Sequence, residues 1–190
     1  MSTLRTITDF KTALAGGGAR PNLFEVTIPN PPTGINLTNN FPILCKAANL
    51  PASNIASIDV PFRGRIFKVA GDRTFDTWSI TIINDQDFLI RDAMEAWMQK
   101  IGQYADGSGD TNPNDYMCDA YVKHFKRSSS KVGKNITTGN GLSTAARYRF
   151  YDIFPTNISA IDLSYDSTDT IEEFTVEFQV QYWNPISKKE

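Results

Sequence analysis

Residues 173–182 read Glu-Phe-Thr-Val-Glu-Phe-Gln-Val-Gln-Tyr, the most regular alternation in the chain. The even positions carry the apolar and aromatic side chains, which are Phe174, Val176, Phe178, Val180 and Tyr182. The odd positions carry Glu173, Thr175, Glu177, Gln179 and Gln181. Successive side chains of a strand point to opposite faces. The pattern therefore predicts a strand over 171–183 with one face in the core and the other in water.

Other segments of the chain have the composition of strands and are separated by turn-forming residues. They lie at 23–28, 41–47, 55–62, 63–69, 78–83, 116–126, 145–154 and 157–165. Between 63–69 and 78–83, the pair Gly71-Asp72 is expected to supply a turn. The predicted fold class is mainly β, an antiparallel barrel or sandwich with one flanking helix and a short N-terminal helix.

The flanking helix is predicted immediately after the strand at 78–83. Apolar residues recur there at helical spacing, at Leu89, Ala93, Ala96, Trp97 and Ile101. Asn84 or Asp85 is expected to cap its start, and Gly102 to end it.

The N-terminal residues 1–18 are predicted to form an arm. Leu4, Ile7, Phe10 and Leu14 are spaced for one face of a short helix, and three glycines at 16–18 provide a hinge. The pattern does not decide whether this helix docks on its own domain or on a neighbouring molecule. Residues 19–185 are expected to form a single β domain with a long mobile hairpin loop at 127–144, followed by a short tail at 186–190.

Composition limits the possible functions. The 190 residues include 19 Lys and Arg against 21 Asp and Glu. A protein that binds nucleic acid through its phosphates needs an excess of basic residues, and this chain has none. Every apolar run is short, which predicts no membrane insertion by this chain. The two cysteines, Cys45 and Cys118, are spaced for neither a zinc site nor a redox pair, and free buried thiols are expected.

The sequence supports no catalytic, cofactor or metal site. His124 is the single histidine, and no nucleophile motif accompanies it. The alternating oxygen ligands of 106–112 resemble a calcium loop, but Thr111 and Met117 stand where an EF-hand requires Gly and Glu. The chain is therefore not expected to be an enzyme.

Basic side chains recur at Arg63, Arg65 and Lys68 in one predicted strand. Two interpretations remain open. These residues either lie on an edge strand, where their charges prevent aggregation, or they form a charged surface that pairs with acidic residues of a neighbouring subunit.

Five blocks of sequence, in order, resemble a known family. They are Ala-Arg-Pro-Asn-Leu-Phe at 19–24, Cys45-Lys46-Ala47 with Leu50-Pro51, Val-Ala-Gly-Asp-Arg-Thr-Phe at 69–75 with Trp78, Pro155-Thr156-Asn157, and Tyr182-Trp183. Together they resemble the tail tube proteins of contractile-tailed bacteriophages. That fold is shared with the ring protein of type VI secretion and with extracellular contractile injection systems.

The resemblance implies a structural virion protein of the tail, assembled in the host cytoplasm. Six copies would form a ring, and stacked rings a hollow tube for genome ejection. The implied partners are further copies of the chain, the tail sheath, the tape-measure protein, the baseplate, the tail terminator and passing DNA. Candidate subunit or ring contacts are Arg63, Arg65, Lys68, Asp72 and Arg73. Glu173 and Glu177 are candidates for the lumen wall, although an outer solvent face suits them equally.

Two other functions stay open from the sequence. One is the tube subunit of a contractile injection system that carries no genome. The other belongs to a different class, a monomeric β-sandwich module that binds a ligand. An enzyme that uses His124 ranks last.

Overall fold

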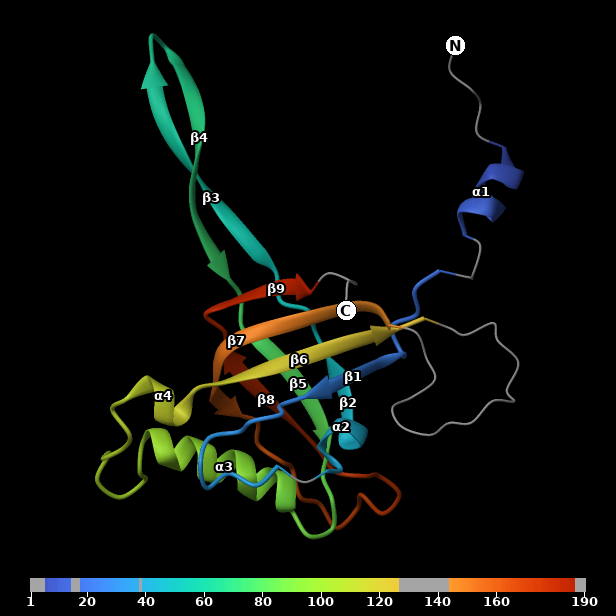
Figure 1. The fold of residues 1–190 in the computed structure, drawn as a ribbon. Coiled ribbons are helices and arrows are strands. Elements are labelled where there is room, and N and C mark those ends of the chain that lie inside the picture. Colours follow the sequence, from blue (N-terminus) through green and yellow to red (C-terminus); the bar gives the residue numbers. More distant parts are fainter. Residues whose placement is uncertain (1–5, 15–17, 38, 127–143, 187–190) are drawn as a thin grey trace.

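The computed structural model describes residues 6–14, 18–37, 39–126 and 144–186. A seven-stranded antiparallel sheet dominates it, in the order β1-β6-β7-β8-β5-β2 with β9 added to β7 (Figure 1). Its strands are β1 (Phe24–Thr27), β2 (Cys45–Ala48), β5 (Trp78–Ile83), β6 (Cys118–Phe125), β7 (Thr144–Ile158), β8 (Glu173–Gln179) and β9 (Tyr182–Ile186). The predicted mainly β, antiparallel fold is confirmed.

The long strand β7 folds the sheet over the core. Its first part pairs with β6 and β9, and its last part pairs with β8. Between the two parts, Asp152 adopts a left-handed backbone with φ 51°, which an aspartate tolerates better than most residues. Within the described residues no ladder joins β1 to β2, so the sheet curls without closing into a hydrogen-bonded barrel.

Aromatic side chains fill the space inside the curled sheet. The Trp78 ring stacks on Phe150 at a centroid distance of 4.7 Å, and Phe178 lies 5.4 Å from Trp78. The flanking helix α3 (Leu89–Ile101) contributes Trp97, whose indole N–H donates to the Tyr116 carbonyl at 2.7 Å. This carbonyl lies in the short helix α4 (Pro113–Tyr116). The core is therefore built from residues of both the N-terminal and the C-terminal half of the chain.

The start of α3 differs from the prediction. Neither Asn84 nor Asp85 caps the helix, because the chain makes a further turn and α3 begins only after Phe88. The Asn84 backbone N–H donates instead to the Glu172 carbonyl at 2.9 Å, which extends the pairing of β5 with β8. The buried helix face is correspondingly rotated and consists of Ile90, Ala93, Met94 and Trp97.

Three predicted strand boundaries were wrong. The segment at 41–47 begins as a helical turn, α2 (Phe41–Leu44), before β2. The segment at 157–165 is not a separate strand, because β7 ends at Ile158. The predicted strand at 171–183 breaks after β8, and Tyr182 opens β9, where it is exposed and stacks on Tyr151 at 4.3 Å.

Strands β3 (Ser53–Phe62) and β4 (Arg65–Phe75) form a separate two-stranded hairpin that projects from the body (Figure 1). Its two-residue turn is Arg63-Gly64, with φ of 45° and 79°, as primed hairpin turns require. The turn predicted at Gly71-Asp72 was therefore wrong, since both residues lie inside β4. A Cβ on Gly71 would lie 3.1 Å from the Ala56 carbonyl oxygen, close to where the register shifts.

The N-terminal helix α1 (Ile7–Ala13) lies apart from the body (Figure 1). Thr6 and Asp9 form a capping box, whose hydrogen bonds stabilise the first turn of the helix. None of its residues is buried, and Ile7 and Phe10 are 73% and 63% exposed. Docking of this helix on its own domain is therefore not seen.

Some sequence predictions fall on residues outside the described ones. Leu4, two of the three hinge glycines, almost all of the loop at 127–144 and most of the C-terminal tail are among them. Among the helices that are described, none combines the length and apolar character needed to span a membrane.

Candidate subunit interface

The β3–β4 hairpin has one apolar face. Directly opposite residues of an antiparallel pair share a face, and Val60 lies opposite Phe67 while Ile58 lies opposite Val69. With Phe62 near the tip, these side chains are 42–66% exposed. We call the set Ile58, Val60, Phe62, Phe67 and Val69 the apolar hairpin face.

The opposite hairpin face is mixed. Lys68 lies across from Asp59, and its Nζ donates to Asp59 Oδ1 at 2.8 Å. The acidic partner expected for this lysine is therefore supplied by its own hairpin. Such an exposed pair stabilises the hairpin by at most about 1 kcal/mol.

The remaining predicted contact residues lie at the tip and the base of the hairpin. Arg63 lies over the Phe62 ring at 5.4 Å, and neither it nor Arg65 forms an ion pair with the described residues. Asp72 and Arg73 are exposed in β4 nearer the body, so the structure brings the five candidates onto one hairpin but not into one cluster.

An exposed apolar hairpin of this length requires a physical explanation. An isolated two-stranded hairpin is marginally stable in water, and contiguous apolar patches on soluble proteins mark interaction sites. The core is complete without the hairpin, since the buried residues of the hydrophobic cluster all belong to other segments. The apolar hairpin face is therefore a candidate interface.

The two lumen candidates lie on the outward face of β8. Glu173 and Glu177 alternate with the buried Phe174 and Val176, as predicted. Glu173 accepts from Lys46 Nζ at 2.5 Å, so its charge is compensated within the chain. Their place on the wet face is confirmed, while their position at a lumen stays a prediction.

A second outward face was missed by sequence reasoning. Arg149 donates to Asp119 at 2.5 Å and 3.1 Å, and this hydrogen bonding raises the pKa of Arg149. Arg147 and Arg149 also lie over the Tyr121 ring, at 4.8 Å and 5.7 Å. The alternation of Arg147 and Arg149 with the apolar residues Ala146, Tyr148 and Phe150 was the available signal.

No arrangement suited to catalysis is seen among the described residues. His124 lies in β6, and its partners on the neighbouring strands are Phe24 and Ala146, neither of which is a nucleophile. Within the same described ranges, no group of three or more His, Cys, Asp or Glu could hold a metal ion. In the loop at 106–112, Asp106 accepts from both the backbone and the hydroxyl of Ser108, which lowers the Asp106 pKa.

Both cysteines are free, as expected. Burial raises the pKa of Cys45 and Cys118 from 9.0 to about 12. Iodoacetamide at pH 8 should therefore alkylate the native protein far more slowly than the unfolded chain, by about 1,000-fold from the thiolate fraction alone. Mass spectrometry with and without denaturant measures this ratio. Equal rates would contradict the burial of the thiols.

The same shift gives a pH dependence of stability. The folded state holds the thiol protons to higher pH than the unfolded state does. The free energy of unfolding should therefore fall as pH rises between about 9 and 12. Replacing both cysteines by Ala should remove this part of the alkaline destabilisation.

An exposed apolar hairpin that projects from a complete core is the geometry of a protein that assembles with other copies or partners. The sequence profile described as phage tail tube protein matches residues 19–185. The chain belongs to the phage tail tube protein family. The tail tube protein gp19 of Enterobacteria phage T4 is 32% identical over 169 residues, covering 89% of this chain and 93% of that protein. The tail tube protein of Serratia phage KSP90 is 25% identical and covers 98% of this chain and 99% of that protein.

Solved structures share the fold of this tail tube protein at lower identity. The tube terminating cap of the anti-feeding prophage superposes with a TM-score of 0.58 at 13% identity, covering 90% of this chain and 91% of that chain. A chain from the sheath–tube complex of an extracellular contractile injection system gives a TM-score of 0.53 at 10% identity, covering 93% of this chain and 97% of that chain. The tail tube protein is thus a structural protein of a virion tail, with the fold of contractile tube proteins.

Proposed function

We propose that this tail tube protein assembles into stacked hexameric rings that form the inner tube of a contractile phage tail. The tube is the conduit for genome ejection, and the protein performs no catalysis. The observation that carries the proposal is the apolar hairpin face, which projects from a complete core and has no partner within the described chain. A monomer in water would leave this face unburied.

Simple geometry supports rings and stacks. Contacts between two different surfaces of identical subunits form rings where the rotation closes, and filaments where it does not. A strand of ten residues, such as β3, spans roughly 33 Å. The hairpin can therefore reach well beyond its own body to a neighbouring subunit.

The predicted contact residues then take distinct roles on this hairpin. The Lys68–Asp59 pair stiffens it, while Arg63 and Arg65 at the tip are available to a neighbour. Asp72 and Arg73, near the base, are proposed to contact the adjacent subunit. The exposed apolar side of α1 suggests that the N-terminal arm also docks on another copy.

The proposed lumen wall is the outward face of β8. Acidic and neutral side chains let DNA pass because they do not attract phosphates. Glu173 and Glu177 lie there beside Thr175, whose hydroxyl is 3.3 Å from that of Thr81. With its net charge of −2, the chain offers DNA little general attraction.

Further partners are proposed from the relatives. Solved structures of similar fold come from a sheath–tube complex, a sheath and tube terminator, and a baseplate. We propose that this protein likewise contacts a sheath, a terminator and a baseplate, and that a tape-measure protein occupies the tube before DNA. The sequence relatives are phage proteins at 25–32% identity, which favours a phage over an injection system without a genome.

Charge reversal at the hairpin tip tests the assembly. Arg63→Glu with Arg65→Glu should prevent polymerisation and leave the monomer folded, because both side chains are exposed and lie outside the core. Electron microscopy shows tubes, and circular dichroism reports the fold. Arg20→Glu with Lys126→Glu makes the same charge change at exposed positions elsewhere and should still form tubes. A wild-type protein that stays monomeric at high concentration would contradict the proposed function itself.

A further inference from the structure

A pocket of about 580 Å³ lies beside the outward face of β6 and β7. Two kinds of side chain line it. The two strands contribute the polar side chains of Tyr121, Lys123 and Arg147. The segment 28–37 and the helical turn α2 contribute a largely apolar surface, with Ile28, Pro29, Pro31, Leu37, Phe41 and Pro42. We call this site the β6–β7 pocket.

The segment 28–37 is held in place from several sides. Ile35 is only 6% exposed and belongs to the core cluster, and its N–H donates to the Pro32 carbonyl at 3.0 Å. Lys100 of α3 donates to the Thr33 carbonyl at 2.9 Å. The prolines of the segment further restrict its backbone. The pocket is therefore formed before a ligand arrives, which lowers the entropic cost of binding.

Positive charge is in excess in the β6–β7 pocket. Lys123 lies directly between Glu25 of β1 and Arg147 of β7. Its Nζ is 3.1 Å from Glu25 Oε1, so one carboxylate faces two cations. Like charges directly opposite each other on neighbouring strands destabilise the pair. An anion bound beside Arg147 would relieve this repulsion.

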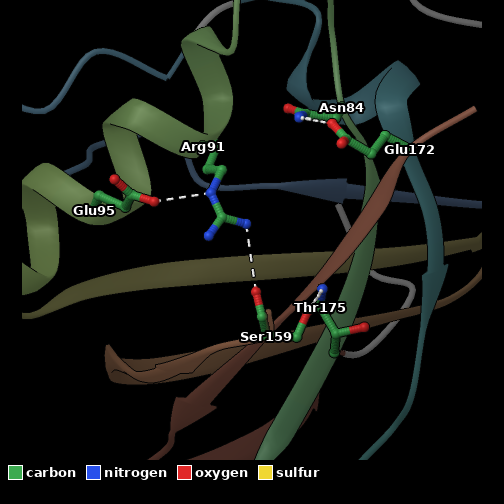
Figure 2. A network of polar contacts seen from close by, with 6 residues as sticks. All are labelled: Asn84, Arg91, Glu95, Ser159, Glu172 and Thr175. Atoms are coloured by element: carbon green, nitrogen blue, oxygen red, sulfur yellow. Dashed lines mark hydrogen bonds and ion pairs between the residues drawn. The ribbon is translucent and has the colours of Figure 1, made fainter. Parts of the chain in front are cut away.

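Arg147 lacks a partner that comparable arginines have. Figure 2 shows Arg91, whose Nε donates to Glu95 at 2.8 Å. Arg149 Nε donates to Asp119 at 3.1 Å in the same way. Arg147 Nε is buried and donates to no atom of the described residues. Buried donors are nearly always satisfied in native proteins, so this one indicates an acceptor supplied from outside.

We propose that the β6–β7 pocket binds an acidic peptide segment of a partner protein, in which a carboxylate lies next to an apolar side chain. The carboxylate pairs with Arg147, whose guanidinium lies over the Tyr121 ring at 4.8 Å and is thereby held in position. The apolar side chain packs against Phe41 and the prolines. The inference goes beyond the proposed tube function, since the pocket lies within a single chain.

The charges favour a peptide over a nucleic acid. Glu25 compensates Lys123 and Asp119 compensates Arg149, which leaves Arg147 as the one uncompensated cation among the described residues of this face. Affinity for a phosphate backbone comes from several basic contacts, and the two carboxylates repel it. One free guanidinium beside an apolar surface fits a single carboxylate with an apolar neighbour.

Peptide binding tests the site in the full chain. The probe is the fluorescein-labelled hexapeptide Glu-Phe-Glu-Pro-Glu-Phe, and Lys-Phe-Lys-Pro-Lys-Phe is its basic counterpart. Wild-type tubes and the soluble Phe67→Asp chain should bind the acidic probe and not the basic one. Arg147→Gln should weaken binding about 10- to 100-fold, because a hydrogen-bonded charge is lost. Arg20→Gln removes the same charge at an exposed position elsewhere and should bind normally.

A second variant separates loss of the site from loss of the fold. Glu25→Gln removes the carboxylate that competes with the peptide for Lys123. It should tighten binding of the acidic probe about two- to fivefold. A misfolded pocket would not bind more tightly, so opposite effects of the two variants identify the site. Fluorescence anisotropy measures both affinities, and circular dichroism reports the fold.

Several results would overturn the site. They are equal affinities of wild type and Arg147→Gln, or no binding of the acidic probe to wild-type tubes. Binding to the soluble chain alone would mean that a neighbouring copy fills the pocket. Tighter binding of a labelled ten-residue oligothymidylate would identify a nucleic-acid site instead. Microscopy of the wild type reports tubes separately. If none form, the proposed function fails and binding to the soluble chain decides the pocket.

Discussion

Phe67→Asp should abolish tube assembly and leave a folded monomer. Phe67 lies at the centre of the apolar hairpin face, opposite Val60, and is 66% exposed in the single chain. Burying such a side chain at an interface stabilises it by about 1.5–3 kcal/mol. A buried carboxylate without a partner adds a further penalty. Each 1.4 kcal/mol is about tenfold in affinity, so the critical concentration for assembly should rise at least roughly 100-fold.

The control for this prediction lies three residues along the same strand. Ala70→Asp introduces the same charge on the other hairpin face, opposite Ser57, and should change the critical concentration far less. Light scattering over a concentration series measures both variants, and circular dichroism verifies that each remains folded. Equal losses in the two variants would mean that the apolar hairpin face is not the interface.

Trp78→Ala should lower the free energy of unfolding of the monomer by about 3–5 kcal/mol. The ring is fully buried, stacks on Phe150 at 4.7 Å and donates its N–H to the Asn49 carbonyl at 3.0 Å. Truncation leaves a cavity and an unpaired carbonyl at the centre of the core. Since native domains are stable by only about 5–15 kcal/mol, the variant should unfold partly at 37 °C.

The measurement requires a monomer, because assembly raises apparent stability by mass action. Chemical denaturation is therefore carried out in the Phe67→Asp background. Tyr182→Ala is the matched control, since this ring also stacks on an aromatic neighbour, at 4.3 Å from Tyr151, but is 43% exposed. We expect it to lose at most about 1.5 kcal/mol. Similar losses for both variants would contradict the central role of Trp78.

The strand β8 and the existence of α3 could be predicted because their signals are local. Alternation of Phe174, Val176 and Phe178 with polar residues reports burial on one side of a strand, and the structure buries all three. The start of α3 was missed because Asn84 has two uses. It is a good capping residue, but pairing of its backbone with Glu172 extends the sheet and delays the helix.

The candidate interface, too, could be predicted from the sequence only in part. Sequence alone placed the basic residues in one predicted strand, without the hairpin that the structure shows. The five blocks of family resemblance placed the chain among tail tube proteins, as the family match confirmed. The ion pair between Lys68 and Asp59 depends on the register of β3 against β4. The two residues are nine positions apart in the sequence, and this spacing does not by itself predict that they lie opposite each other. Asn84 and Glu172 lie 88 residues apart in the sequence, so the hydrogen bond between their side chains had no sequence signal.

The sequence by itself determined the mainly β class, the buried face of β8, the free thiols and the family. Each of these follows from residue order or composition within short segments. The tertiary structure alone decided that Ile58, Val60 and Phe67 are exposed rather than part of the core. An apolar strand has the same local pattern whether it is covered by its own domain or by a neighbour, because burial depends on what packs against it. For this reason two strands predicted from the sequence became the proposed contact of a tube only once the structure showed them paired and uncovered.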